Sequence, residues 1–383
     1  MSGAYCTIGS RDDPPPPNPL VNLCRFGNCN LEKGSSDMSE IHTVGLDIAK
    51  AVLQVHAVNE SGEVVLKRRL ATKDMACFFE ELPPCLIGME AGGGANYLAQ
   101  KLIAIGHTVK VMPASYVKPY VKTNKNDAND AEAICEAVRR PNMRFVPVKC
   151  PEQQAVLNLH RTRALLSRQK VSLITSLKAA LAEFGIVVAK NSPGTRDALR
   201  VIGNSKEKSL PRLARASLRL LVEHLNVTEA RILECQKLIE AIHKQTKPCL
   251  RLATVPGIGP LAATALVAIV GDGTTFRSGR EMAAWLGLVP RQHSSGGRQA
   301  LGGISKRGDT YIRRLLVIGA MSLMNRGQKS KHRMVHWALG IASRKHYKIG
   351  AVALANKIAR IAWAVLVRGQ PFKEEQVGLD RSL

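Results

Sequence analysis

The sequence has few aromatic residues, and its cysteines are not paired as in zinc or redox motifs. Aromatic side chains make up only 4% of the 383 residues, which argues against a single-strand binder built on stacking platforms. None of the nine cysteines forms a Cys-x-x-Cys pair, and the closest two are Cys24 and Cys29. Scattered reduced thiols in a cytoplasmic protein fit this pattern best. Cys85 and Cys235 fall at apolar-periodic positions and are expected in the core.

Long apolar runs and acidic residues are also scarce. No unbroken apolar run reaches the roughly 18 residues that a membrane-spanning helix needs, so no membrane insertion is expected. The 30 Asp or Glu are outnumbered by 55 Lys or Arg, which gives a formal net charge of +25. This charge suits a polyanion, because phosphate contacts supply much of the affinity of proteins for DNA and RNA. A ribosome- or membrane-associated protein is the alternative.

The positive charge is concentrated near the carboxyl end, and the amino end differs from the rest. Residues 246–383 hold 22 Lys or Arg against 6 Asp or Glu, a net charge of +16. Residues 1–37 contain a proline run and three cysteines but no apolar periodicity and no secretory signal. Met38 is the expected natural start, which makes residues 1–37 either a mis-called extension or a disordered leader.

Residues 38–148 predict a mixed α/β domain. Short apolar segments indicate strands at 43–48, 53–58, 64–68, 86–89 and 109–112, with helices at 75–82, 95–105 and 127–139. Three successive strands followed by alternating helices and strands is the order of a ribonuclease-H-like fold.

Residues 149–246 predict long helices with heptad spacing. The first pattern comprises Leu159, Leu166, Leu173, Leu177, Ala180 and Phe184, and the second comprises Leu218, Leu221, Leu225, Ile232, Cys235, Ile239 and Ile242. Gly185, Pro193-Gly194 and Gly203 break the pattern between them. The two helices are expected to form an antiparallel hairpin or a dimerising coiled coil, with an ordinary helical bundle as the alternative.

Four acids stand where a divalent-metal site is expected. Asp47 lies in the first strand, Glu90 ends the run Cys-Leu-Ile-Gly-Met-Glu, and Asp127 and Asp130 lie three apart on one face of a helix start. A carboxylate in an apolar strand is costly unless a hard cation compensates it, and oxygen donors favour Mg²⁺ over Zn²⁺. Two such ions could serve an in-line phosphoryl displacement. The alternative is that these acids are turn or cap residues, with Asp127 as the N-cap.

Two further acids lie on the same predicted helix. Glu132 and Glu136 are expected to be solvated rather than to bind metal. The four ligands predicted for the metal are therefore Asp47, Glu90, Asp127 and Asp130.

Two segments of the basic half are candidates for binding nucleic acid. Thr254-Val-Pro-Gly-Ile-Gly-Pro resembles the turn of a helix-hairpin-helix, in which Gly257 and Gly259 let backbone amides approach a phosphate. Residues 287–309 are rich in glycine, hydroxyl groups and positive charge. This composition predicts a loop that wraps around the phosphate backbone of a nucleic acid. Its predicted phosphate contacts are Arg291, Ser294, Arg298, Lys306 and Arg307, although each arginine or lysine could be a plain surface charge.

The same loop holds a candidate nucleophile. Ser294 and Ser295 precede two glycines, where a hydroxyl is presented with little hindrance, but a serine nucleophile needs activation by a base or a metal. His293 is adjacent, yet neighbouring side chains often point apart. From the residues alone, Ser295 is more often a phosphate-contacting or turn serine than a nucleophile.

Taken together, these segments resemble the DEDD transposases of the insertion-sequence 110 family, which are related to Piv-type DNA invertases. The resemblance rests on Val-Gly-Leu-Asp-Ile-Ala-Lys, Gly-Met-Glu-Ala, Asn-Asp-Ala-Asn-Asp-Ala-Glu, Pro-Gly-Ile-Gly-Pro, Gly-Leu-Val-Pro-Arg, Ser-Ser-Gly-Gly and Ile-Ser-Lys-Arg-Gly-Asp. It implies a RuvC-like domain over 38–148, a coiled-coil linker over 149–246, a mainly α-helical transposase domain over 247–370 and a tail over 371–383.

The resemblance also implies an activity. Asp47, Glu90, Asp127 and Asp130 would bind Mg²⁺, with two ions expected and Mn²⁺ as a possible substitute, and Ser295 would attack DNA, with Ser294 in reserve. The expected partners are double-stranded donor and target DNA, a guide RNA encoded by the element, and a second protomer in a homodimer or homotetramer. The expected location is the cytoplasm, at the nucleoid. A metal-only Holliday-junction resolvase or nuclease and a non-catalytic nucleic-acid-binding remnant are the alternatives.

Overall fold

The computed structural model describes residues 38–49, 51–122, 126–189, 191–205, 208–296, 298–330 and 332–373. The predictions about residues 1–37 therefore lie outside the described residues. The chain divides into two compact units, with the boundary between Pro151 and Glu152. Each unit is described by itself.

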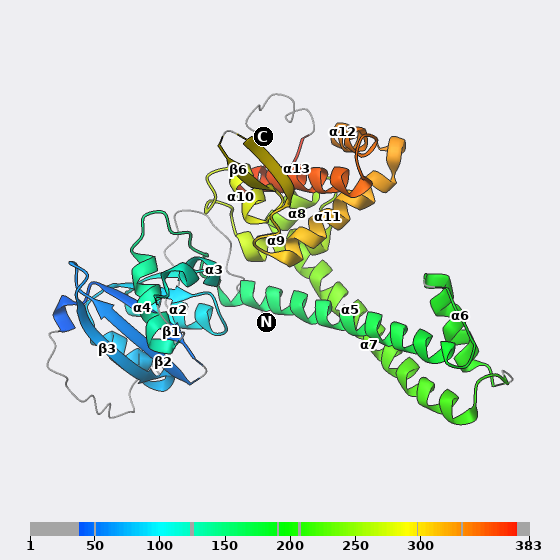
Figure 1. Cartoon of the computed structure of the whole chain (residues 1–383), viewed down its shortest axis with the longest axis horizontal. Helices are drawn as coiled ribbons and strands as arrows, with labels where there is room; N and C mark the ends of the chain where they lie inside the picture. Colours follow the sequence, from blue (N-terminus) through cyan, green and yellow to red (C-terminus); the bar gives the residue numbers. More distant parts are fainter. Residues whose placement is uncertain are drawn as a thin grey trace. The chain divides into compact units, whose positions relative to one another are not determined.

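The first unit is a mixed α/β domain built on a five-stranded sheet (Figure 1). Its strands are β1 (Thr43–Ile48), β2 (Val52–Val58), β3 (Val64–Ala71), β4 (Leu86–Glu90) and β5 (Thr108–Met112), in the spatial order β3-β2-β1-β4-β5. β1, β2 and β3 pair antiparallel, because short turns join them, whereas β1, β4 and β5 run parallel and need longer crossovers. The predicted mixed α/β class and the predicted strands are confirmed.

Helices cover both faces of this sheet. α1 (Met75–Glu80) and α2 (Ala95–Ile105) supply Phe78, Leu98 and Leu102 to a core with Leu46 and Leu53 of the sheet. The opposite face carries α4 (Asp127–Val138), which packs with Met112 and Val117 in a second cluster. Successive strand residues point to opposite faces, so the odd-numbered residues of β1 face α4. Shorter turns of helix complete the unit: η2 (Met38–Glu40), η3 (Thr72–Asp74), α3 (Ala114–Val117) and η4 (Lys118–Tyr120).

The second unit begins with two long helices, α5 (Pro151–Ala182) and α7 (Arg212–Gln245). Heptad residues of both helices, including Leu177, Leu218 and Leu225, share one buried cluster, and Lys170 of α5 pairs with Glu229 of α7 at 2.7 Å. Both predicted long helices are therefore present, while their interlocking as a coiled coil and their role in dimerisation stay predictions.

The connection between α5 and α7 contains a short helix. Pro193-Gly194, which interrupts the heptad pattern, lies in the first turn of α6 (Ser192–Gly203). Proline is tolerated there because the first amides of a helix have no intrahelical acceptor. Asn191 caps this helix by accepting a hydrogen bond from the Gly194 amide at 3.1 Å.

The remainder of the second unit is mainly helical. Its helices are α8 (Lys247–Ala253), α9 (Pro260–Val270), α10 (Gly279–Trp285), α11 (Thr310–Asn325), α12 (Arg333–Ala342) and α13 (Tyr347–Arg368), with the turn η5 (Gly327–Lys329). Leu266, Leu316 and Leu354 are fully buried in their common core. The segment predicted as a phosphate-moulded loop instead forms a two-stranded antiparallel hairpin, β6 (Pro290–Ser295) and β7 (Arg298–Ile304).

One helix bears on the membrane prediction. By length and composition α13 could cross a bilayer, although Lys348, Lys357 and Arg360 interrupt its apolar sequence. However, 61% of its apolar window is buried inside the protein. Its apolar residues are the central packing surface of the C-terminal core, which accounts for their number.

Candidate metal centre and serine hairpin

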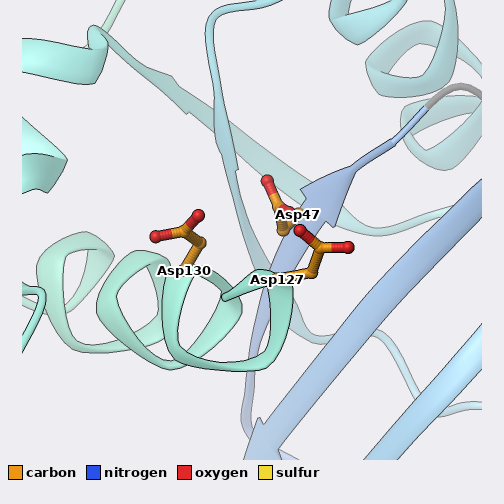
Figure 2. Close-up of side chains that lie close together, drawn as sticks. All are labelled: Asp47, Asp127 and Asp130. Atoms are coloured by element: carbon orange, nitrogen blue, oxygen red, sulfur yellow. The ribbon is translucent and has the colours of Figure 1, made fainter. Parts of the chain in front are cut away.

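Three of the four predicted acids lie together. Asp47 comes from β1 and Asp127 and Asp130 from the start of α4, and one carboxylate oxygen from each lies within 4.8 Å of the others (Figure 2). Asp47 and Asp130 are half-buried, and Asp127 is exposed. Three carboxylates at this separation repel one another unless a cation lies between them. Oxygen donors in this number suit Mg²⁺ or Mn²⁺, so the residues present fit the predicted cofactor.

Two glycines bring α4 close enough to the sheet to form this cluster. Gly45 of β1 and Gly88 of β4 are paired in register. A Cβ added at Gly45 would lie 2.5 Å from the Cys135 amide nitrogen, and one added at Gly88 would lie 2.8 Å from the Val138 Cβ. Only hydrogen fits at either position, so α4 packs directly on the backbones of both strands.

The start of α4 is fixed by a side chain other than the predicted one. Asn126, not Asp127, is the N-cap, and its Oδ1 accepts a hydrogen bond from the Asn129 amide at 2.7 Å. The alternative that Asp127 caps the helix is therefore wrong. Asp127 and Asp130 occupy the first turn, where the helix dipole stabilises negative charge.

Glu90 is not part of the three-residue cluster. The parallel pairing of β1 with β4 ends with Leu46 beside Met89, so Asp47 and Glu90 are the next residues on neighbouring strands. Both lie two residues beyond the glycines that face α4 and therefore point to the same side of the sheet. Glu90 therefore lies one strand away from Asp47 on the same face, and its role as a ligand stays a prediction.

Sequence reasoning missed a set of polar residues beside this cluster. Glu132 was expected to be solvated, but its carboxylate accepts a hydrogen bond from Lys122 Nζ at 2.9 Å and lies 4.0 Å from Lys67 Nζ. The bond from Lys122 holds the pKa of Glu132 below its usual value. His56 is buried nearby, and burial lowers its pKa despite the attraction of Glu132. The period-2 pattern of β2 and β3 could have indicated that these strands share a polar face.

The serines lie on the hairpin of the second unit. Every residue of β6 is exposed, and Ser295 is paired with Arg298 beside the turn at Gly296. Alternation along the strand places Ser295 and His293 on one face and Ser294 on the other, where Gln292 donates a hydrogen bond to Ser294 Oγ at 3.0 Å. His293 therefore shares a face with Ser295, two residues away.

A buried arginine builds the base of the hairpin. Arg313 donates hydrogen bonds from Nη1 to the carbonyl oxygens of Leu286 at 2.9 Å and Arg307 at 3.0 Å. Lys306 has φ +56°, which is uncommon for a residue with a side chain. The Lys306 and Arg307 side chains are exposed, so this turn holds two cations outward at the foot of the hairpin.

The two glycines predicted to approach phosphate differ in their surroundings. Gly257 has φ +87° and packs against Ile358 and Leu323, so its lack of a side chain serves the helical core. Gly259 is exposed directly before α9 and has open space around its Cα. Of the two, Gly259 has the surroundings expected for a phosphate contact.

A buried histidine joins α5 to the C-terminal helices. The Thr264 hydroxyl donates its proton to the Pro260 carbonyl, so it accepts a hydrogen bond from His160 Nε2 at 3.0 Å. His160 Nδ1 then accepts a hydrogen bond from the Tyr311 hydroxyl at 2.9 Å. Burial lowers the pKa of His160 to about 4. The neutral ring is thus the form that this arrangement stabilises.

Comparison with known proteins places the chain among transposases. The sequence model described as Transposase IS116/IS110/IS902 family matches residues 249–335, and the DEDD transposase model of the IS110 group matches residues 44–186. A probable family 20 transposase of Pseudomonas aeruginosa is 46% identical over 326 residues, which cover 85% of this chain and 96% of the relative. The transposase for insertion sequence element IS1328 of Yersinia enterocolitica is 38% identical over 88% of this chain and 100% of the relative.

The chain therefore belongs to the IS116/IS110/IS902 family of transposases, which confirms the resemblance seen in its sequence motifs. A pilin gene-inverting protein of Moraxella lacunata is 33% identical over 129 residues, covering 32% of this chain and 37% of that protein.

Proposed function

We propose that this transposase cuts and rejoins donor and target DNA with the acidic cluster of its first unit and a serine of its second. The observation that carries this proposal is the convergence of Asp47, Asp127 and Asp130 from two elements. Like charges gathered at this distance are costly in an empty site and are accounted for by a bound divalent cation. The order β3-β2-β1-β4-β5 supports a ribonuclease-H-like, RuvC-like domain as their scaffold.

The cluster and Glu90 would hold the metal. When bound, Mg²⁺ or Mn²⁺, with two ions expected, would supply charge neutralisation at the scissile phosphate. Asp47 of β1 would hold the metal together with Asp127 and Asp130 of α4 and Glu90 of β4. The close packing of α4 on Gly45 and Gly88 would keep these carboxylates in place without the metal.

Ser295 would be the nucleophile. Its Oγ would form a bond to phosphorus as the bond to the 3′-oxygen of the DNA breaks. The serine proton would pass to a base, and the departing 3′-oxygen would take up a proton and become a hydroxyl. The resulting phosphoserine conserves the phosphodiester energy. A 3′-hydroxyl of the partner strand would then attack this phosphorus and release the serine. His293 shares a face with Ser295 and is the candidate base, with Ser294 as the alternative nucleophile.

The assembly would be larger than one chain. The acids and the serine lie far apart in the sequence, so we propose a composite site that is shared between protomers. The long helices α5 and α7 would support a homodimer or homotetramer. The basic residues Arg291, Arg298, Lys306 and Arg307, together with Gly259, would hold DNA phosphates or a guide RNA encoded by the element. The place of action would be the cytoplasm, at the nucleoid.

The deciding experiment is a search for a covalent protein–DNA adduct. Full-length protein, with RNA transcribed from the element's ends, is incubated with end-labelled donor and target DNA in Mg²⁺ and then denatured. We expect an adduct that is lost in Ser295→Ala and in Asp127→Asn but retained in Ser294→Ala.

Other outcomes would assign another function. Metal-dependent nicking without an adduct, unaffected by either serine substitution, would favour a hydrolytic resolvase in which water attacks. Salt-sensitive DNA binding with no cleavage under any condition would favour a non-catalytic binding protein. An adduct lost only in Ser294→Ala would move the nucleophile by one residue.

A further inference from the structure

A group of cations borders the acidic cluster on the α4 side of the sheet. We call Lys67, Arg69 and Lys122 the basic strip. Lys67 and Arg69 belong to β3, the edge strand, and Lys122 lies shortly before α4. All three side chains are exposed.

The strand register aligns this strip with the acidic cluster. Asp47 pairs with Gln54, and Gln54 pairs with Arg69, so these residues form one row across β1, β2 and β3. The neighbouring row runs through Gly45, His56 and Lys67. Paired residues point to the same face, so Lys67 and Arg69 share the face of Asp47.

An independent contact confirms the orientation of β3. Arg68, between the two strip residues, lies over the Phe78 ring of α1 at 5.6 Å, on the opposite face of the sheet. Because side chains alternate along a strand, Lys67 and Arg69 must face away from α1. Among the described residues, α4 packs on β1, β2 and β4, while Lys67 and Arg69 stay exposed on this face of the edge strand.

Glu132 of α4 joins two cations of the strip. Its carboxylate bonds to Lys122 at 2.9 Å and lies 4.0 Å from Lys67. One acid thus holds two ammonium groups from separate segments near each other. The three cations exceed this one acid, and the strip with Glu132 keeps a net charge of +2.

We infer that the basic strip binds the phosphates of the DNA strand that is cut, on one side of the scissile phosphate, with Glu132 as the residue that positions its lysines. The inference rests on the proposed function, since it takes the acidic cluster as the site of cutting. A polyanion is the partner because the strip offers three exposed cations.

The spacing fits a short stretch of DNA. Neighbouring strands lie about 4.8 Å apart, so Arg69 is two strand spacings, or about 10 Å, from Asp47. A DNA strand advances about 3.4 Å per nucleotide along the helix axis, so a strip about 10 Å away falls within about three nucleotides of the phosphate at the cluster.

The test combines charge removal on the protein with charge removal on the DNA. Single phosphates of a DNA carrying an element end are replaced in turn by neutral methylphosphonate. Binding to full-length protein, with the element's RNA, is measured in Ca²⁺ over a range of salt. For wild type we expect substitution at one or two positions within about three nucleotides of the cut to weaken binding.

In the double variant Lys67→Ala/Arg69→Ala, methylphosphonate at those same positions should no longer weaken DNA binding. Because this variant lacks two phosphate-binding cations, the slope of log affinity against log salt should fall by about 1.8, and affinity at 0.1 M salt should fall more than about tenfold. Lys101→Ala is the matched control, because Lys101 lies on α2, beneath the other face, over the Tyr97 ring. It should keep the wild-type slope and pattern.

Two outcomes would overturn the inference. One is that methylphosphonate weakens DNA binding by the double variant as much as it weakens binding by wild type. The losses of affinity from the protein change and from the DNA change would then simply add. The other is an unchanged salt slope. Failure of the proposed function would be seen separately, because wild-type protein would then form no covalent adduct. An adduct formed by the double variant at high protein concentration would show that the cutting chemistry survives the loss of the two cations.

Glu132→Gln tests the positioning residue. Loss of this carboxylate frees two lysines, so DNA binding should become tighter at low salt while the methylphosphonate effect spreads over more positions. Mn²⁺ affinity, measured by calorimetry, should stay within about twofold of wild type. Weaker Mn²⁺ binding with an unchanged methylphosphonate pattern would instead make Glu132 a metal ligand and refute its positioning role.

Discussion

Substitution of Gly45 by alanine should damage the metal centre without touching any of its acids. The added Cβ would lie 2.5 Å from the Cys135 amide nitrogen and 2.7 Å from the Cys135 Cβ. Because non-bonded carbon atoms prefer separations of about 3.5–4.0 Å, α4 would have to retreat from β1 by about 1 Å. Asp127 and Asp130 lie on that helix and Asp47 lies on the strand, so the distances between their carboxylates would grow.

The expected losses have two separate sizes. Overpacking should lower the free energy of unfolding by about 1–3 kcal/mol, as measured by urea denaturation. A displacement of about 1 Å at a catalytic centre costs on the order of 100-fold in activity, which a cleavage assay would detect, and Mn²⁺ affinity measured by calorimetry should fall as well.

Gly93→Ala is the matched control. Gly93 lies in the same unit, and a Cβ there would meet no atom within 4 Å. This variant should match wild type in stability, Mn²⁺ affinity and cleavage. Wild-type Mn²⁺ affinity and cleavage in Gly45→Ala would refute the view that the close approach of α4 to the sheet sets the geometry of the cluster.

Three further predictions concern charge and buried polar groups. In EDTA, Asp127→Asn should raise the free energy of unfolding by about 1 kcal/mol, the repulsion of unit charges near 5 Å in water, yet it should abolish Mn²⁺ binding; a less stable metal-free variant would contradict this. His160 has its pKa lowered to about 4 from 6.5, so the unfolded chain takes up a proton that the folded one refuses as the pH falls from 6.5 to 4. The difference in stability between wild type and His160→Gln should therefore shrink by about 3 kcal/mol over that range, and urea denaturation at pH 7 and pH 4 would reveal a constant difference if the reasoning fails. Arg313→Met should cost about 3 kcal/mol, since it leaves the Leu286 and Arg307 carbonyls without their donor, and should speed trypsin cleavage at Arg291; equal cleavage rates would mean that Arg313 does not brace the hairpin.

The sequence determined the elements that depend on local pattern. Strands β1 and β4 and helix α2 were predicted nearly to the residue, because apolar alternation and glycine ends are local signals. The heptads of α5 and α7 likewise specified long helices. The motifs around the four acids, together with those of the glycine-rich basic half, indicated the family to which the chain belongs.

Only the tertiary structure decided which side chains meet. The gathering of Asp47 with Asp127 and Asp130 depends on α4 resting on Gly45, a contact between residues about 90 positions apart that no local pattern encodes. The hairpin of Ser295 was mistaken for a loop because its glycines and polar residues have low strand propensity, whereas pairing with β7 stabilises it. The link from Glu132 to Lys67 and Lys122 arises for the same reason: strand register and helix packing set distances that sequence separation does not determine.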